Sequence, residues 1–255
     1  MSFSSLFVAL FPLLLFLRDV SSQAVFAHIV AGNSGSYSSQ DWLNDINLAK
    51  SAGFDGFIMD IAPDTYNLQP MLDLTYAAAE QVSDFKIWLS FDYTGGFNTD
   101  GTPWHADQVS SLISDYSSSA AQYLWADGRP VVTTFEGCDN LDDWTTIKAE
   151  TNCFFIPNYS CLGPAAAVSA PGVDGLAAWD DAAWPVGPTN ITTAGDEGYL
   201  AVLDSKPYMM PVSPWFFRDV YGDNWLWRGD DLWFDRWNQV TQIKPDIVQV
   251  ITWND

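Results

Sequence analysis

The sequence predicts an α/β fold, the closed (β/α)8 barrel of the TIM type. Short apolar runs that read as strands alternate with helical segments along the chain, which is the pattern of a parallel sheet covered by helices. The length of 255 residues suits one such barrel. An open doubly wound sheet is the main alternative, but no GxGxxG or phosphate-binding loop follows a strand. We find no internal repeat or linker, and we expect one barrel domain.

The expected strands share runs of β-branched or aromatic residues between turn-forming residues. In chain order they are residues 24–30, 56–61, 86–91, 131–135, 153–156, 175–178, 208–212 and 247–252. The last strand is the clearest, because Ile247, Val248, Val250 and Ile251 give it the composition of a strand buried on both faces.

The expected helices show apolar residues at helical spacing, or start and stop signals. In chain order they are residues 40–52, 71–82, 106–124, 141–151, 197–203 and 232–240. Trp42, Ile46 and Ala49 fall on one face of the first helix, with Ser39 as its expected cap. Pro70 opens the second helix, because proline suits a first turn. We expect the aromatic segment before the last helix to be a long loop.

Composition narrows the possible ligands. Acidic residues outnumber basic ones 32 to 10, for a formal charge of −22, so we expect neither nucleic acid nor an anionic membrane as a partner. An anionic substrate is disfavoured in the same way, and a neutral ligand fits. Aromatic residues make up 15% of the chain, with 13 Trp. Most belong in a core, but Trp beside Asp and Asn also favours sugar binding, because an indole face packs on the C–H face of a pyranose.

Acidic side chains follow several expected strands, where a barrel places its reactive groups. They are Asp60, Asp92, Glu136, Asp180 and Asp255. Glycoside cleavage uses two carboxyl groups that flank the scissile bond. Any one of these acids alone reads as a helix cap or a solvated loop residue, but several on one rim predict a carbohydrate-cleaving pocket.

Other side chains near the strand ends suit substrate binding. Asp60, Glu136 and Asp180 are expected to bind sugar hydroxyls, and His28 and Asn254 offer further hydrogen bonds. For His28, a purely structural role is an equal alternative. The candidate stacking platforms are Trp179, Trp215, Trp227 and Trp253, of which at least two are expected to be buried.

The N-terminal segment and the cysteines point to secretion. Residues 3–17 are almost continuously apolar, so residues 1–22 read as a signal peptide and residues 23–255 as the catalytic barrel domain. We therefore expect an extracellular or cell-wall protein, and we expect a monomer. Cys138, Cys153 and Cys161 allow one disulfide and one free thiol, and the pairing stays open. Sequons at Asn158 and Asn190 agree with secretion.

No pattern in the sequence predicts a cofactor or a metal. The cysteine spacing is irregular, and His28 and His105 lie far from it, which disfavours zinc. The acidic residues between Asp223 and Asp235 do not match a calcium-binding EF-hand loop. Arg228 is expected to pair with Asp230 or Asp231 next to it.

Eight fragments of the sequence form a recognisable series: FAHIVAGN, DWLNDINLAKSAGFDGF, FKIWLSFDY, VVTTFEG, FFIPN, YMMPVSPWFF, NWLWRGDDLWFDRW and VQVITWND. Together and in this order, they resemble the fungal α-1,3-glucanases (mutanases) of glycoside hydrolase family 71. The resemblance covers nearly the whole chain after residue 22. It implies a secreted (β/α)8 endo-1,3-alpha-glucosidase that inverts the anomeric centre and uses no metal cofactor, with neutral α-1,3-glucan as its substrate. The catalytic carboxylates carry over to Asp92 and Asp255.

The sequence departs from the family pattern in two places. The last segment of the family continues Trp-Asn-Asp-Tyr-Gly-Glu-Ser, and its Glu has no counterpart here because the sequence stops at Asp255. We therefore expect a barrel truncated after the eighth strand, and the alternative function is an impaired homologue that only binds glucan. Asn158 stands where the resemblance implies an acid. Endo or exo action, and which carboxylate is the acid, stay open.

Overall fold

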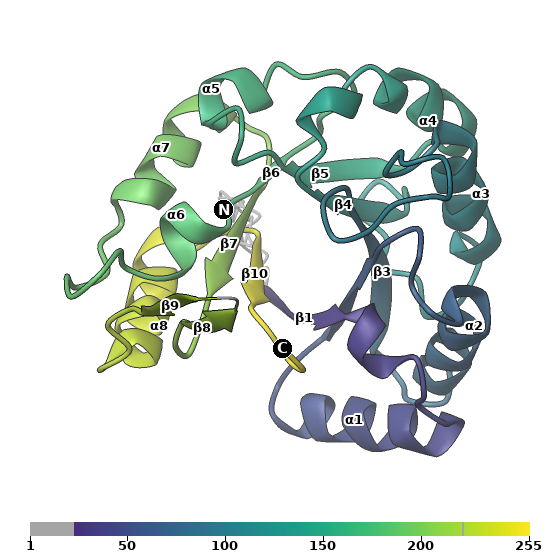
Figure 1. The fold of residues 1–255 in the computed structure, drawn as a ribbon, viewed down its shortest axis with the longest axis horizontal. Coiled ribbons are helices and arrows are strands. Elements are labelled where there is room, and N and C mark those ends of the chain that lie inside the picture. Colours follow the sequence, from purple (N-terminus) through teal and green to yellow (C-terminus); the bar gives the residue numbers. More distant parts are fainter. Residues whose placement is uncertain (1–22, 221) are drawn as a thin grey trace, which may run out of the picture.

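The computed structural model describes residues 23–220 and 222–255, without the side chains of residues 180, 181, 220 and 223. A closed barrel of parallel strands lies at its centre, and helices surround the barrel (Figure 1). The predicted (β/α)8 fold is therefore confirmed. The predicted signal peptide falls outside the described residues. Within them, every helix is too short or too polar to cross a bilayer.

The barrel strands follow one another around the barrel in chain order. They are β1 (Ala24–Val30), β2 (Gly56–Ile61), β3 (Lys86–Asp92), β4 (Val131–Phe135), β5 (Phe154–Asn158), β6 (Leu176–Ala177), β7 (Tyr208–Val212) and β10 (Ile247–Val250). Pairing of Ala24 with Ile247 places β10 beside β1 and closes the barrel. The observed bounds of β1, β2, β4 and β7 are those predicted.

The helices include every predicted one, with shifted ends, and two short helices between β5 and β7 that the sequence did not predict. They are α1 (Ser39–Ser51), α2 (Leu68–Ala79), α3 (Ala106–Tyr116), α4 (Asp143–Thr151), α5 (Pro164–Ala167), α6 (Asp180–Ala183), α7 (Ala194–Leu203) and α8 (Leu232–Ile243), with 3-10 turns η1 (Ala31–Ser34) and η2 (Cys138–Asn140). Helix α1 is capped by Ser38 rather than Ser39, because Ser38 and Asp41 form a reciprocal capping box. Helix α3 ends earlier than predicted, because Ala121 and Tyr123 bond to the backbone of Ile87 in β3.

Successive side chains along each strand point alternately toward the surrounding helices and into the barrel interior. One face packs on the helices and forms the larger core cluster. The other faces the barrel interior, where apolar side chains form a floor, for example Phe26, Ile58 and Trp88. Because the side-chain period is two, the next inward position on each strand lies one layer higher. In six strands this layer is polar and buried: His28, Asp60, Ser90, Thr133, Asn158 and Gln249.

The aromatic segment after β7 forms an antiparallel hairpin instead of the predicted loop. Its strands are β8 (Phe217–Val220) and β9 (Asp223–Leu226). Arg218 lies opposite Trp225 in the register, with its guanidinium 5.0 Å from the centre of the Trp225 ring. Such a cross-strand cation–π pair stabilises the hairpin. The hairpin lies between β7 and α8 in the chain, and Figure 1 shows it in front of α8.

A fully buried ion pair joins the last helices to the barrel. Arg236 of α8 donates to both carboxylate oxygens of Asp196 of α7, at 2.8 and 3.1 Å. Arg236 also donates to the backbone oxygen of Pro211, and the Tyr208 hydroxyl donates to Asp196 at 2.8 Å. These bonds supply the partners that two charges need in an apolar interior.

We expect Asp196→Ala to destabilise the fold strongly, because it leaves the Arg236 guanidinium buried without its counter-charge. Removing one partner of a buried pair costs about 3–5 kcal/mol. Urea unfolding followed by circular dichroism measures the change. Glu150→Ala on the exposed surface of α4 is the matched control, and it should stay within about 0.5 kcal/mol of the unchanged chain. An equal, small effect of both substitutions would contradict the assigned role of the pair.

The two sequons differ in accessibility. The Asn158 amide is buried and donates to Ser160 and to the backbone oxygen of Ala177, whereas Asn190 is exposed in the segment before α7. When the protein is secreted from a eukaryotic host, we expect a glycan on Asn190 and none on Asn158. Mass spectrometry before and after enzymatic deglycosylation measures site occupancy, with Asn190→Gln as the control. A glycan found on Asn158 would contradict the burial of that side chain.

Candidate active site

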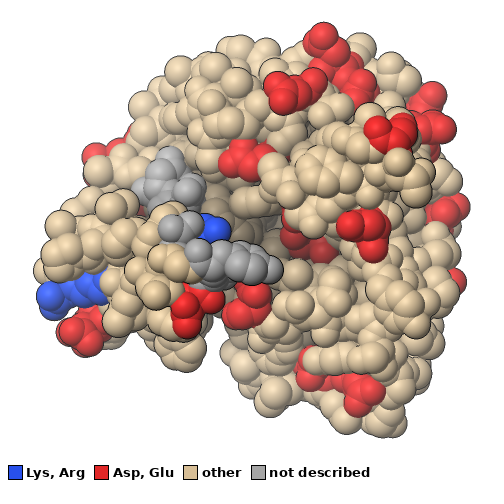
Figure 2. Space-filling model, viewed as in Figure 1, with Lys and Arg blue, Asp and Glu red and all other residues tan. Residues whose placement is uncertain are grey.

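A cavity of about 760 Å3 opens at the carboxyl ends of the barrel strands. Residues at or just after these strand ends form its floor and one wall, and the β8–β9 hairpin forms the opposite wall. Figure 2 shows a hollow near the centre of this face, with acidic side chains around it. A volume in this range is typical of small-molecule sites, so this is the candidate active site.

The cavity brings together most of the side chains that the sequence predicts for the site. They are His28, Asp60, Asp92, Glu136, Trp179, Trp215, Trp227 and Asp255. Trp179 lies between His28 and Phe135, with ring centres 4.9 Å from each. Both predicted catalytic carboxylates, Asp92 and Asp255, therefore face the same cavity. The side chain of Asp180 is outside the described residues.

Trp253 and Asn254 lie outside the cavity, contrary to their predicted place in it. Trp253 packs edge-on against Phe54, and its indole N–H donates to Asp45 of α1. The Asn254 amide bonds to both the N–H and the carbonyl oxygen of Val30, at 2.9 and 3.0 Å. Asn254 thus attaches this segment to the end of β1, and Trp253 attaches it to α1 and to the segment before β2. The polar groups of both side chains are used in these contacts.

Asp92 ends β3 and carries the clearest electrostatic signal of the cavity. One carboxylate oxygen, Oδ1, accepts hydrogen bonds from the backbone N–H groups of Thr94 and Gly95, both at 2.7 Å, and from the Thr94 hydroxyl. These bonds lower the pKa of Asp92, but burial and the negative charge of Asp60 outweigh them and raise it. Asp92 therefore holds a proton at a higher pH than an ordinary aspartate does.

His28 and Asp60 form the polar part of the cavity floor. Only 2% of His28 and 8% of Asp60 are exposed, and His28 Nε2 lies 3.6 Å from Asp60 Oδ1. That separation is too long for a hydrogen bond. Both ring nitrogens of His28 and Oδ1 of Asp60 lack a hydrogen-bond partner among the described residues. Buried polar atoms normally have partners, so a ligand or water in the cavity is the natural source of them.

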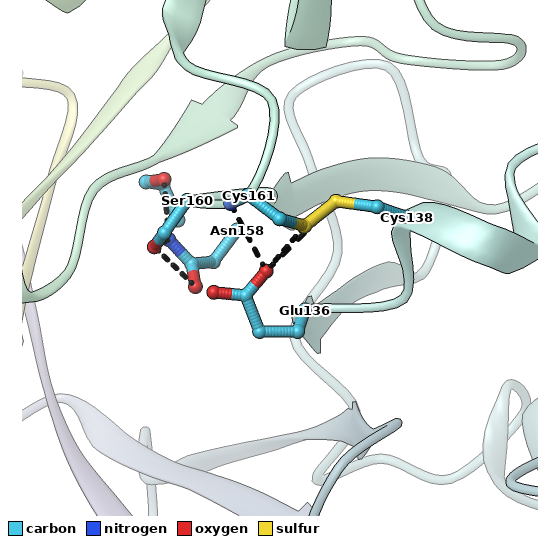
Figure 3. Close-up of a disulfide and its surroundings, with 6 residues drawn as sticks. Glu136, Cys138, Asn158, Ser160 and Cys161 are labelled. Atoms are coloured by element: carbon cyan, nitrogen blue, oxygen red, sulfur yellow. Dashed lines mark hydrogen bonds between the residues drawn. A yellow bond between two sulfur atoms is a disulfide. The ribbon is translucent and has the colours of Figure 1, made fainter.

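Glu136 follows β4 and lies next to a disulfide (Figure 3). The disulfide joins Cys138 to Cys161, which settles the pairing that the sequence left open and leaves Cys153 as a buried thiol. Glu136 Oε2 accepts from the backbone N–H of Cys161 at 3.3 Å and lies 2.6 Å from Cys161 Sγ. A disulfide sulfur has no proton, so the backbone contact orients the carboxylate.

Sequence reasoning missed Trp184, Phe216 and Trp225, which line the cavity wall beside the predicted Trp227. Trp184 stacks on Phe216 at 4.4 Å between ring centres, and Phe216, Trp227 and Trp225 continue the row at 6.2 and 5.9 Å. All four line the cavity. Their clustering on one wall gives a ligand an extended apolar surface opposite the carboxylates. The dense aromatic composition from Trp215 onward was the available signal.

One group of potential metal ligands occurs among the described residues, and it does not make a metal site here. It consists of Glu136, Cys138 and Cys161. The two sulfurs are joined in the disulfide, so neither is the thiolate that binds metals. Carboxylates, one imidazole and aromatic faces make up most of the cavity lining, together with Arg218, whose guanidinium lies over the Trp225 ring. This mixture of acceptors, donors and apolar faces suits a neutral ligand rich in hydroxyl groups.

Comparison with known proteins decides the family. The profile of glycosyl hydrolase family 71 matches residues 21–255. The chain belongs to glycosyl hydrolase family 71. It is 32% identical over 263 residues to the glucan endo-1,3-alpha-glucosidase agn1 of Schizosaccharomyces pombe, covering 97% of this chain and 59% of the relative. It is 33% identical over 249 residues to a mutanase of Penicillium rubens, covering 93% and 54%.

The chain spans less than two thirds of the length of either family 71 relative. A solved structure shares its fold at low sequence identity. The GH99 endo-alpha-mannosidase of Bacteroides thetaiotaomicron superposes with a TM-score of 0.69 at 14% identity, covering 91% of this chain and 83% of that one. At this identity the likeness supports the barrel fold alone.

We expect Asp60→Asn to lower the pKa of Asp92, because the substitution removes one of the two effects that raise it. A raised pKa means that Asp92 stabilises the folded chain below its ordinary pKa and loses this contribution as pH rises through the raised value. In Asp60→Asn that loss should move to lower pH. Carbon-13 NMR titration of the Asp92 carboxyl measures the shift.

The matched control is Asp84→Asn, at an exposed turn position between α2 and β3. This substitution should leave the titration of Asp92 unchanged. An unchanged midpoint in Asp60→Asn as well would show that the two carboxylates are not coupled.

Proposed function

We propose that this chain hydrolyses the α-1,3-glucosidic bonds of a neutral glucan, with inversion at the anomeric carbon. The observation that carries the proposal is the placement of Asp92 and Asp255 on one cavity, opposite a wall of aromatic side chains, in a family 71 barrel. The names of the two relatives, a glucan endo-1,3-alpha-glucosidase and a mutanase, support the choice of linkage.

In this mechanism one carboxyl group protonates the glycosidic oxygen as the bond to the anomeric carbon breaks. The other carboxylate removes a proton from a water molecule, which attacks the opposite face of the sugar and forms the new C–O bond. Inverting enzymes keep the two groups about 6.5–9.5 Å apart to leave room for that water. The raised pKa of Asp92 suits a group that carries a proton, while Asp255 is exposed at the cavity rim.

The remaining cavity residues fit the recognition of a glucan chain. Trp179, Trp215 and Trp227 offer faces for the C–H surface of a pyranose, while His28, Asp60 and Glu136 offer hydrogen bonds for its hydroxyl groups. Asp180 is proposed to join them. The charge of −22 favours a neutral polysaccharide over an anionic one.

We also infer that the protein is secreted to the cell exterior or the cell wall. The Cys138–Cys161 disulfide supports this, because disulfides persist mainly in oxidising compartments. The apolar run at residues 3–17 supports it as well. A monomer fits a site that one chain builds by itself.

The test is release of reducing sugar from insoluble α-1,3-glucan by the purified chain, with proton NMR of the fresh product to identify its anomer. We expect release and the inverted β-anomer. Asp92→Asn and Asp255→Asn should each lower the rate by about 10²–10⁴-fold, the usual effect of losing a general acid or base. Asp84→Asn, at an exposed turn, should leave the rate unchanged.

Two outcomes would contradict the proposal. Binding to the glucan without release of reducing sugar would favour the alternative, a homologue that binds glucan without cleaving it. Release from a different member of a panel of α- and β-glucans, with none from α-1,3-glucan, would assign another linkage.

A further inference from the structure

A second, smaller cavity of about 210 Å3 adjoins the candidate active site. The two cavities share Val30, Asp60 and Asp92. The other residues of the smaller cavity come from the loops after β1, β2 and β3, away from the hairpin. We propose that it is a binding subsite for a further sugar unit of the glucan chain, on the far side of Asp60 and Asp92 from the aromatic wall. This inference rests on the proposed function and extends it.

The size and lining of the smaller cavity suit one neutral sugar ring. Its volume corresponds to about seven water molecules at ~30 Å3 each. Asp60, Asp64 and Asp92 supply acceptors, and Thr65 and Tyr66 add hydroxyl groups. Among the described residues that line it, none is Lys or Arg. An excess of acceptors without a cation fits a ligand that donates many hydrogen bonds, as a sugar does.

The same three carboxylates do not form a site for a cation. Their oxygens do not all lie within 4.8 Å of one another, whereas a metal ion would require them to converge on one point. Oxygens spread around a cavity instead match hydroxyl groups spread around a pyranose. Asp60 is more than nine-tenths buried, and its Oδ1 lacks a partner among the described residues. It is thus an acceptor ready for a ligand in either cavity.

The loop after β3 forms a close-fitting wall of the smaller cavity. A Cβ atom on Gly95 would lie 1.9 Å from Asp92 Oδ2, and one on Gly96 would lie 1.9 Å from Asp64 Oδ1. Two adjacent glycines therefore allow the backbone to touch both carboxylates, which any side chain would displace. This contact holds Asp64 and Asp92 at one edge of the cavity.

Tyr66 adds an aromatic surface to the lining of the smaller cavity. Its side chain is 70% exposed, although its segment is held in place: Ala62 N–H donates to the Thr65 hydroxyl at 3.0 Å, and Thr65 N–H donates to Ala62 oxygen at 3.1 Å. An exposed aromatic ring beside a polar cavity resembles the aromatic anchors of binding sites. We assign it to stacking on the sugar unit in this subsite.

The test is calorimetric binding of a graded series of α-1,3-linked glucose oligosaccharides, which needs no catalysis. Affinity of the unchanged chain should rise with oligosaccharide length until both cavities are filled. Tyr66→Ala should lower the affinity for the long members about tenfold and leave the shortest unchanged. Asp64→Asn should act in the same direction, because an amide is a weaker acceptor than a carboxylate.

The matched controls are Phe234→Ala, an exposed aromatic residue on α8, and Asp84→Asn, an exposed acid between α2 and β3. Neither residue lines either of these two cavities, so both variants should bind every oligosaccharide as the unchanged chain does. Identical binding by Tyr66→Ala and Asp64→Asn would overturn the subsite, as would an affinity that does not depend on length.

The outcomes also separate the subsite from the proposed function. Length-dependent binding that Tyr66→Ala weakens, without release of reducing sugar, would uphold the subsite and overturn hydrolysis. Failure of the unchanged chain to bind any α-1,3-linked oligosaccharide would overturn both.

Discussion

The site depends on one geometric constraint, the period of two in strands that close into a barrel. Alternate side chains of each strand point into the barrel interior. Two positions after each residue of the apolar floor, the next inward-pointing side chain therefore lies above it. Phe26 is followed by His28, Ile58 by Asp60, and Trp88 by Ser90 and then Asp92. The floor blocks the barrel from below, and the polar positions above it face the cavity. A one-residue slip of any strand would exchange its inward side chains for those that pack on the helices.

The same constraint buries polar side chains in the interior of the site, which lowers the stability of the fold. An unpaired buried polar group costs about 1–3 kcal/mol, and His28 and Asp60 both contribute such atoms. The larger core between barrel and helices offsets this cost. Asp92 avoids it in part, since Thr94 and Gly95 satisfy one of its oxygens. The unsatisfied atoms of His28 and Asp60 therefore lie in the cavity, where a ligand or water can supply their missing partners.

Composition was enough to predict the strands, because β1, β2, β4 and β7 are short apolar runs between clear turn residues. The positions of Asp60, Asp92 and Glu136 at or after strand ends also predicted that these acids lie at one rim of the barrel. The prediction failed for Trp253 and Asn254, because they follow the last strand, where alternation no longer determines direction. The hairpin was missed because the contact of Arg218 with Trp225 exists only between two strands. The loop contacts that form the smaller cavity join segments far apart in sequence, and no local pattern encodes them.

The disulfide gives the molecule a dependence on its surroundings that the barrel itself lacks. It joins Cys138 to Cys161, which lie in the loops after β4 and β5, across 23 residues of sequence. Both cysteines lie outside the paired strand residues, so the disulfide takes no part in the backbone ladder between β4 and β5. The orientation of Glu136 does depend on it, through the neighbouring N–H of Cys161. Protein produced in a bacterial cytosol would therefore keep its barrel while the rim of the cavity around Glu136 loosened, and a conventional check of folding would not notice the difference.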